Sequence, residues 1–393
     1  MSKKQLLALF ICSLVPWTVG NGLVPLLPVY ATELGADPAV AGYYLAFSYG
    51  ALAVGAVAAG WLSDKLQRRK TPLIVAGLVG IPVAWLLGRV RNIWSLSVLT
   101  ALLWLCGGLG LAFVSILTGL SAGQDERGKI FGILSLTGGL GALIGGLTTG
   151  AIVDRWGFPT MFTAIAFSLI LWPIAALFLT EKESVQGKAQ QTWKRPRLGK
   201  NFYLLFAASL VASVASFTIV LGRSLLMSDL NFGAMAIAST GAVGGAVAMP
   251  LPLVMGWLSD RAGRKRFIYL SYLVGITSLA ILAMSTSLWH FWIVLVLQSV
   301  FAAGSGTIGN AWVADLVAPE SLGRGLSLFS ATSWIGGVVG FAGAGYALKS
   351  LGPLPTFLIG IGLTLTAIVL LIPIRSRLRS HRTAVQPAEG ERP

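Results

Sequence analysis

Charged residues are scarce in this sequence of 393 residues: they make up 11% of it, with 14 acidic and 29 basic side chains. Hydrophobic residues make up 55%, which is more than a soluble globular protein usually carries. The net charge of +15 is shared among short loops between apolar runs and is not gathered in one basic patch. The composition predicts a protein of the lipid bilayer and excludes nucleic acid as a partner.

Cysteine and histidine are also rare, with two of each. Cys12 and Cys106 fall inside apolar runs, which predicts that they are packing residues, while His290 and His381 lie outside these runs. No His-Glu-x-x-His or Cys-x-x-Cys motif occurs, and no nucleophile stands beside a base. We therefore expect no enzyme activity, no cofactor and no metal site.

No carboxylate lies in the middle of an apolar run. Coupling to protons usually needs a titratable group within the membrane. Only acids near the ends of the runs remain as candidates, such as Glu33 and Asp315. The sequence therefore leaves two alternatives open: a transporter coupled to protons through such a group, or a facilitator driven by the gradient of its own substrate.

Apolar runs long enough to cross the bilayer fill most of the chain, since a spanning helix needs roughly 20 mostly apolar residues. They predict an all-α membrane protein with twelve transmembrane helices, at 6–30, 38–63, 72–89, 93–122, 129–153, 158–179, 202–227, 233–257, 267–286, 291–317, 325–348 and 353–375. The longest polar stretch lies between the sixth and seventh runs. The predicted domains are a six-helix bundle at 1–179, a linker at 180–201, a second six-helix bundle at 202–375 and a basic tail at 376–393.

Lysine and arginine are gathered in alternate loops. Placing both termini and the linker on one side leaves only a few basic residues on the other side: Arg89, Arg91, Arg155, Arg223 and Lys349. Because positive loops stay in the cytoplasm, this pattern predicts that both termini are cytoplasmic. The outer loops are short and no Asn-x-Ser/Thr acceptor occurs, which favours a bacterial inner membrane.

The pentapeptide Gly-Trp-Leu-Ser-Asp occurs twice, at Gly60 to Asp64 and at Gly256 to Asp260, each time at the end of an apolar run. Such a duplication predicts two related halves, as in many transporters. An aspartate at the end of one helix can also face the N-terminus of a neighbouring helix, where unpaired N–H groups attract an anion.

These loops resemble the Gly-x-Leu-x-Asp-Arg-x-Gly-Arg-Arg/Lys motif of the major facilitator superfamily, whose fold of two pseudo-symmetric six-helix bundles is then implied for the whole chain. The second copy matches fully, while the first has Lys65 and Gln67 at two motif positions. The resemblance implies that Asp64 meets the helix at 325–348 and Asp260 the helix at 129–153, closing the cytoplasmic side. The implied gate residues are Gly60, Asp64, Arg68, Arg127, Gly256, Asp260, Arg264 and Arg324. The alternative is that such charges serve topology alone, and we assign Arg69, Lys70 and Arg266 to that role.

Glycine is abundant, and the run at 129–153 carries Gly141, Gly145, Gly146 and Gly150. This spacing predicts close helix packing. It is also similar to the antiporter motif of drug-exporting facilitators, although Gly146 stands in place of that motif's proline and Thr149 in place of a glycine. The opening segment from Gly20 to Tyr30 resembles the first span of the twelve-span drug and metabolite exporters, so export is favoured over import.

Polar and aromatic residues deep in the predicted spans are candidates for the substrate path: Trp17, Asn21, Tyr49, Trp104, Arg223, Gln298, Asn310 and Trp334. A buried amide needs a partner, so Asn21, Gln298 and Asn310 should face a cavity or pack against another helix. Arg223 either extends to the membrane interface or binds an anionic group of the substrate. The set as a whole favours an amphiphilic or uncharged solute.

We therefore expect a monomeric secondary transporter that moves a small organic solute by alternating access, with export favoured over import. The alternatives are an uncoupled facilitator or importer of a small metabolite, and a membrane sensor or scaffold that transports nothing. Its partners would be that solute, the bilayer and, if transport is coupled, protons.

Overall fold

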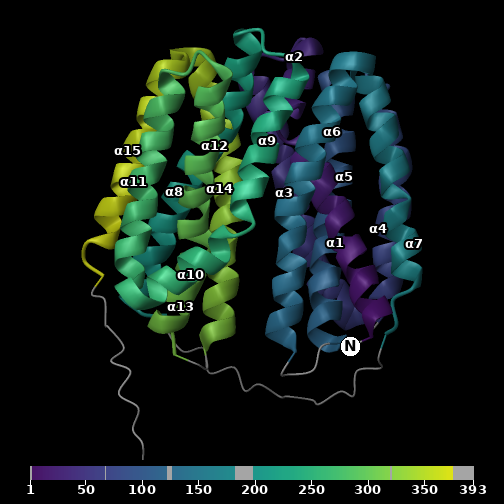
Figure 1. The fold of residues 1–393 in the computed structure, drawn as a ribbon, viewed down its shortest axis with the longest axis horizontal. Helices are drawn as coiled ribbons and strands as arrows, with labels where there is room; N and C mark the ends of the chain where they lie inside the picture. Colours follow the sequence, from purple (N-terminus) through teal and green to yellow (C-terminus); the bar gives the residue numbers. More distant parts are fainter. Residues whose placement is uncertain (1, 67, 122–125, 182–197, 319–320, 375–393) are drawn as a thin grey trace, which may run out of the picture.

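The computed structural model describes residues 2–66, 68–121, 126–181, 198–318 and 321–374, and the regular elements of these residues are helices. Figure 1 shows α1 to α7 on one side of the molecule and α8 to α15 on the other. The first group comprises α1 (Lys3–Leu23), α2 (Leu27–Glu33), α3 (Pro38–Leu66), α4 (Lys70–Leu87), α5 (Ile93–Ser121), α6 (Arg127–Leu169) and α7 (Leu171–Leu177). The second comprises α8 (Lys200–Asp229), α9 (Ala234–Ala248), α10 (Leu251–Ala262), α11 (Arg264–Ala283), α12 (Leu288–Ala303), a π-helical turn (Gly304–Ile308), α13 (Gly309–Leu316), α14 (Leu322–Leu351) and α15 (Pro353–Leu371).

The bundle has two ends that differ in charge. Lys3, Lys70, Lys200 and Arg264 open the helices α1, α4, α8 and α11, and this end of the bundle, at the bottom of Figure 1, is called the basic end. The opposite end, where α3 and α9 begin, is called the far end.

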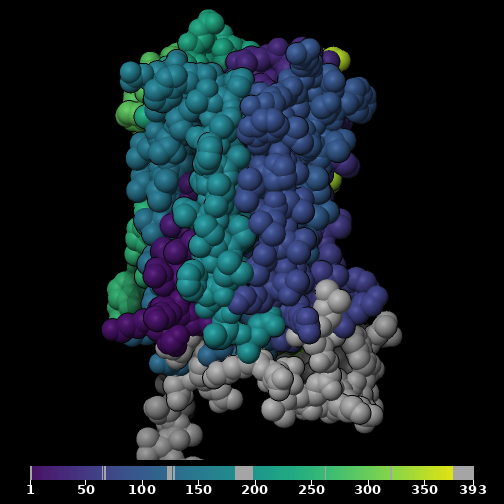
Figure 2. All heavy atoms as spheres, turned by 90° about the vertical axis from the view of Figure 1, so that its right-hand side faces the viewer, coloured from purple at the N-terminus to yellow at the C-terminus, as the bar shows by residue number. Residues whose placement is uncertain are grey.

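Within the described residues, ten helical stretches are long and apolar enough to cross a membrane, or eleven if α9 and α10, which are bent by 44° at their junction, count as one. One of the ten is the 49-residue stretch Lys129–Leu177. Its helical geometry is broken at Gly157, whose φ of 77° suits glycine and few other residues. The break falls where the sequence predicts the gap between two spans. Figure 2 shows the helical segment that follows Gly157, in teal, beside α4.

The outer surface of the bundle is apolar. Leu171, Leu177 and Phe178 are exposed, and so are tryptophans near both ends, among them Trp94 at the far end and Trp61 at the basic end. Tryptophan is enriched where a protein meets the membrane interface. An apolar surface with tryptophans at its ends suits a protein surrounded by lipid.

Glycine faces on α6 bring the two groups of helices together. A methyl group added at Gly145 would lie 2.8 Å from the amide nitrogen of Gly22 in α1, and one at Gly146 would lie 2.5 Å from the amide nitrogen of Ala242 in α9. Gly141 also faces α1, and Gly150 faces α9. One helix therefore makes backbone contact with its own half on one side and with the other half on the opposite side.

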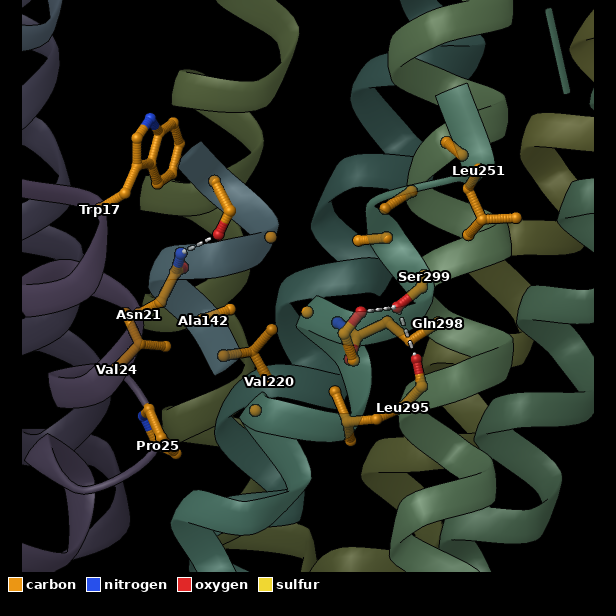
Figure 3. Close-up of a pocket in the computed structure, with 18 of the residues that line it drawn as sticks. Trp17, Asn21, Val24, Pro25, Ala142, Val220, Leu251, Leu295, Gln298 and Ser299 are labelled. Atoms are coloured by element: carbon orange, nitrogen blue, oxygen red, sulfur yellow. Dashed lines mark hydrogen bonds between the residues drawn. The ribbon is translucent and has the colours of Figure 1, made fainter. Parts of the chain in front are cut away.

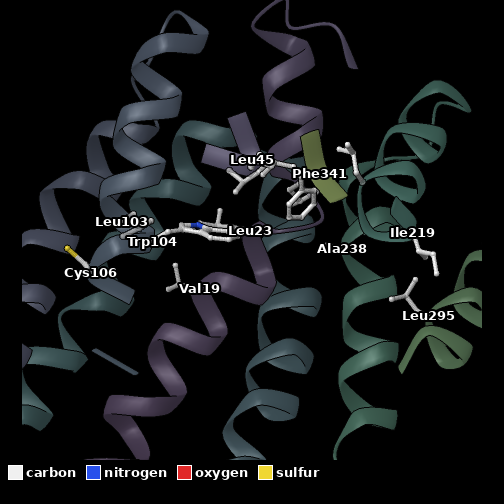
Figure 4. Packing of buried hydrophobic residues seen from close by; sticks show 14 of the residues in the cluster. Val19, Leu23, Leu45, Leu103, Trp104, Cys106, Ile219, Ala238, Leu295 and Phe341 are labelled. Atoms are coloured by element: carbon white, nitrogen blue, oxygen red, sulfur yellow. The ribbon is translucent and has the colours of Figure 1, made fainter. Parts of the chain in front are cut away.

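A second contact between the halves joins α3 and α14, where Gly42 and Gly345 face each other. Next to it the buried ring of Phe341 lies 5.3 Å from Tyr49 and 5.1 Å from Phe217, measured between ring centroids. Figure 4 shows Phe341 near Leu45 among the buried residues. The interface between the halves thus combines glycine contacts with aromatic rings that pack at a tilt.

Both cysteines pack as predicted. Cys12 and Cys106 are buried and free, and Figure 4 shows Cys106 on the same helix as Leu103 and Trp104. The sulfur of Cys12 lies 3.7 Å from the carbonyl oxygen of Trp172.

Gly146→Ala should destabilise the contact between α6 and α9, because the new methyl group meets backbone atoms that cannot move aside. We expect a loss of about 1–3 kcal/mol, the usual cost of overpacking, seen as a lower thermal midpoint of the purified protein. Gly132→Ala is the matched control, since a methyl group there meets nothing within 4 Å on the same helix. Equal midpoints for the two variants would contradict the packing role.

Candidate functional site

Two adjoining cavities of about 360 and 420 Å³ lie inside the bundle and share Trp17, Asn21 and Val24 of α1. The first is lined mainly by helices α6, α8, α9 and α12, and the second by α3, α5 and α7 with Trp334 of α14. We call the two together the central cavity. Its walls come from both halves of the chain, and Figure 3 shows α1 residues facing Gln298 and Ser299 of α12 across it.

The structure brings together all but one of the candidate path residues. Lining the central cavity are Trp17, Asn21, Tyr49, Trp104, Arg223, Gln298 and Trp334. Asn310 is the exception: it is exposed on α13 and lines neither cavity. The sequence placed it in one regular helix with Gln298, but the π-helical turn at Gly304–Ile308 separates the two residues and alters the face that follows.

Tyr49 stands at the centre of the aromatic wall. Its ring centroid lies 5.1 Å from that of Trp104, 4.9 Å from that of Phe217 and 6.3 Å from that of Trp334. These rings come from α3, α5, α8 and α14, so the cluster joins the two halves. Trp104 is only 5% exposed, which agrees with the deep position in its span that the sequence predicts.

The two amides of the cavity each make one packing hydrogen bond. Asn21 Nδ2 donates to the carbonyl oxygen of Gly138 at 3.1 Å, and Gln298 Nε2 donates to that of Ser216 at 3.2 Å. The Oε1 atom of Gln298 is buried and has no hydrogen-bond partner. Both alternatives raised by the sequence therefore apply, since these side chains pack against a helix and also line the cavity.

Arg223 is a buried cation on the wall of the cavity. Its side chain is in α8, it is 3% exposed, and its Nε and Nη1 atoms are buried without a hydrogen-bond partner. The arginine therefore does not extend to the membrane interface, and this excludes the first of the two alternatives that the sequence left open for it. None of the described residues that line the cavity is acidic.

Polar contacts between the halves close the far end. Asp154, near the end of the first part of α6, accepts hydrogen bonds from the amides of Ala234 and Met235 at 2.7 and 2.9 Å. A carboxylate is favoured there because the first N–H groups of α9 are otherwise unpaired. The aspartate of one half thus caps a helix of the other.

The second far-end contact is an ion pair of 2.7 Å between Asp37, just before α3, and Lys349 of α14. Asp37 also accepts a hydrogen bond from the amide of Val40. The hydrogen bond from Lys349 holds the pKa of Asp37 below its ordinary value. The ion pair is therefore complete at neutral pH and is lost only when the pH falls through that lowered pKa.

At the basic end, the described contacts of Arg264 do not join the halves. Arg264 pairs with Asp260 and with Asp315, the latter at 3.3 Å, and donates to Ser259 at 2.7 Å, so these contacts stay within the second half. The side chain of Asp260 is 60% exposed. The contact of Asp260 with α6 remains a prediction for another state of the protein.

Five other gate candidates are Gly60, Gly256, Arg324, Asp64 and Arg127. Arg324 lies exposed in the first turn of α14, and a methyl group at Gly60 or Gly256 would meet nothing within 4 Å. The side chains of Asp64 and Arg127 lie outside the described part of the chain, as does Gln67.

The two loops contact their motif serines through arginines at different motif positions. Arg69, not Arg68, donates to the motif serine Ser63, six positions earlier at 2.8 Å, whereas Arg264 donates to a serine five positions earlier. The first copy thus has one extra residue before its contacting arginine. Arg68 is exposed.

The same shift applies to the lysines of the two loops. Lys70 donates to the carbonyl oxygen of Leu177 at 2.6 Å, and Lys265 donates to those of Ile372 and Ile374 at 2.8 and 2.7 Å. Each lysine thus ties its loop to the last helix of its own half. Arg69 and Lys70 therefore make contacts within the first half in addition to the topology role that the sequence predicts for them.

The central cavity has walls from two groups of apolar helices, and polar contacts close one end of the bundle. This arrangement is typical of membrane transporters. The chain belongs to the major facilitator superfamily, whose family model matches residues 9–287 and 251–392. It is a multi-pass protein of the bacterial inner membrane and falls with the drug and metabolite exporters, as the motifs predicted.

Two relatives illustrate the similarity. The chain is 29% identical over 272 residues to the multidrug resistance protein MdtG of Klebsiella pneumoniae (strain 342), a match that spans 65% of each chain and so just under two thirds of that relative. It is 26% identical over 354 residues to MdtG of Proteus mirabilis (strain HI4320), covering 84% of this chain and 86% of the relative. Among solved structures, the nucleoside transporter NupG has the same fold at 16% identity, with a TM-score of 0.78 over 93% of this chain and 98% of NupG.

Asp154→Ala should weaken closure of the far end, because it removes both acceptors from the N-terminus of α9. Losing such a cap costs about 1 kcal/mol, which corresponds to a shift of about fivefold in the population of the closed state. Distances between a spin label on α2 and one on α9, measured by electron–electron double resonance, would report that shift.

Asp229→Ala is the control for this substitution, since Asp229 is also a far-end aspartate, at the last position of α8. We expect its distance distribution to match that of the unmodified protein. An unchanged distribution in Asp154→Ala would show that the cap does not hold the far end closed.

Proposed function

We propose that the protein is a secondary transporter that exports a small amphiphilic organic solute by alternating access. The observation that carries the proposal is the central cavity, which has walls from both halves and a far end held by Asp154, by the Asp37–Lys349 pair and by glycine contacts. A solute bound there would be released to the far side if these contacts opened. In the other state of the cycle the basic end would close while the far end is open.

The proposed topology has twelve spans with both termini in the cytoplasm. Support comes from the basic residues at one end and from the break at Gly157, which divides the 49-residue stretch into two spans. Grouping 1–179 and 202–375 as two six-helix bundles, with a linker at 180–201 and a tail at 376–393, follows from this count. In this topology the far end is periplasmic, and the structure is the state that faces the cytoplasm.

Export is favoured by the relatives, which are named multidrug resistance proteins. The aromatic wall around Tyr49 and Trp104 suits a solute with an apolar or aromatic body. A cavity of this size also falls in the usual range for small-molecule sites.

A second candidate function is an uncoupled facilitator or importer. It is favoured by the cavity itself, whose described lining has no carboxylate to carry a proton. Proton coupling would then depend on an acid outside the cavity, such as Glu33, where partial burial raises the pKa above its ordinary value. Asp315 is paired with Arg264, as described above.

The transport proposal is tested in proteoliposomes with solutes that raise the thermal midpoint of the purified protein, since a ligand stabilises the state that it binds. Tyr49→Ala should slow the uptake of such solutes at least ~10-fold, because it removes the centre of the aromatic wall. Trp94→Ala, an exposed aromatic residue on the outer surface, should keep the rate within ~2-fold.

An imposed pH gradient separates the two candidate functions. Accumulation against a concentration gradient, lost in Glu33→Gln, supports coupled export through that acid. Equilibration that ignores the pH gradient supports the facilitator. Absence of movement for every stabilising solute contradicts transport.

Asp260→Asn should weaken closure of the basic end in the opposite state, where the aspartate is proposed to meet α6. The population should shift toward the state with an open basic end, by about fivefold for a loss of about 1 kcal/mol. Maleimide labelling of a cysteine introduced at Ser299 in the cavity would detect the shift from the basic side. Asp315→Asn is the control, since it shares Arg264; equal labelling in the two variants would contradict the gate role of Asp260.

A further inference from the structure

We propose that Arg223 and Gln298 form a subsite for the acidic group of the transported solute, which would then be an amphiphilic organic anion. The inference rests on the proposed function, and it narrows the solute to a chemical class. Three features of the cavity support it: an unpartnered cation, an unpartnered acceptor and an apolar aromatic wall.

The first feature is the state of the guanidinium group. Two nitrogens of Arg223, Nε and Nη1, are buried without a hydrogen-bond partner although the side chain lies on the wall of a cavity. Burying a charge without a partner costs several kcal/mol. A binding partner that enters the cavity would remove this cost.

An oxyanion is the partner that fits a guanidinium group best. Arginine presents its N–H donors in a planar fork that matches a carboxylate or a similar oxyanion through two parallel hydrogen bonds. The described lining of the cavity contains no acidic residue that could fill this role. The described lining of the cavity therefore does not supply the anion.

The side chain of Gln298 sets a second requirement for the solute. Its Nε2 atom is bound to Ser216, which lies on α8 together with Arg223, and this bond ties α12 to the helix of the cation. The remaining Oε1 atom is buried without a partner, so it can accept a hydrogen bond from an O–H or N–H group. A solute with a donor close to its acidic group would satisfy both side chains.

The rest of the cavity selects an apolar body. Trp17 and Asn21 belong to both parts of the central cavity and connect the Arg223 region with the aromatic wall. An acid bound at Arg223 can therefore place an aromatic or aliphatic body toward Tyr49 and Trp104. The geometry selects a compound with one charged end and one apolar end.

The test uses a pair of probes that differ only in charge, 2-naphthoate and the neutral 2-naphthamide. Their affinities for the full-length protein in a non-ionic detergent are measured by titration calorimetry. We expect 2-naphthoate to bind at least ~10-fold more tightly, because only the carboxylate pairs with Arg223. Arg223→Gln should remove this difference by weakening 2-naphthoate at least ~10-fold and changing 2-naphthamide less than ~2-fold.

Two further variants serve as controls. Arg89→Gln replaces an arginine that is stacked on Trp85 outside the cavity, and it should leave both affinities unchanged. Arg223→Lys keeps the charge but loses the planar fork, so it should give an intermediate affinity for 2-naphthoate. It also serves as the test variant if Arg223→Gln does not elute as a single species in gel filtration.

Equal affinity of the two probes for the unmodified protein, absence of 2-naphthoate binding, or 2-naphthoate binding that survives Arg223→Gln would each overturn the anion subsite. Uptake of both probes into proteoliposomes separates this outcome from a failure of the proposed function. If both are transported at equal affinity, the subsite is wrong and transport stands. If 2-naphthoate binds through Arg223 but neither probe is transported, the subsite stands and the proposed function is wrong.

Discussion

Direct backbone contact between the halves is the constraint on which the other features of this structure depend. Lipid chains are as apolar as the helices, so hydrophobic burial does not hold two helices together in a membrane, whereas close packing and hydrogen bonds do. Gly146 and Gly150 let α6 approach α9, and Gly42 and Gly345 let α3 approach α14. These two contacts join the halves, and the same four helices also line the central cavity. Larger side chains at these positions would push Arg223 and Tyr49 away from the rest of their site.

Much of this arrangement could be predicted from the sequence, because it follows from properties of whole segments. The duplicated pentapeptide indicated two halves, the glycine spacing indicated the packing face of α6, and the depth of Trp104 indicated a position inside the protein. Side-chain direction could not be predicted. Whether Arg223 turns toward the membrane interface or the cavity depends on how α8 packs against its neighbours. Asn310 was misplaced because a π-helical turn has no clear sequence signal, and Arg69 was missed because one extra residue shifts the first loop.

The attraction between a carboxylate and a helix N-terminus appears in both the prediction and the structure, but at opposite ends. The sequence motif predicted this interaction for Asp64 and Asp260 at the basic end. In the described state Asp154 makes this interaction at the far end, where no sequence motif predicted it. A contact at one end alone would shift the population toward one state, whereas contacts at both ends stabilise both states of the cycle. The cap made by Asp154 at the far end thus complements the repeated motif of the other end.

The two far-end contacts also differ in how they respond to ions in the surrounding medium. Asp37 and Lys349 are both substantially exposed, with side chains 38% and 55% accessible, so dissolved salt screens their attraction. Asp154 instead binds backbone amides at short range, and such hydrogen bonds depend far less on ionic strength. In concentrated salt the contact between α3 and α14 would therefore loosen before the contact between α6 and α9. The far end would then open unevenly, as a hinge along α6 and α9.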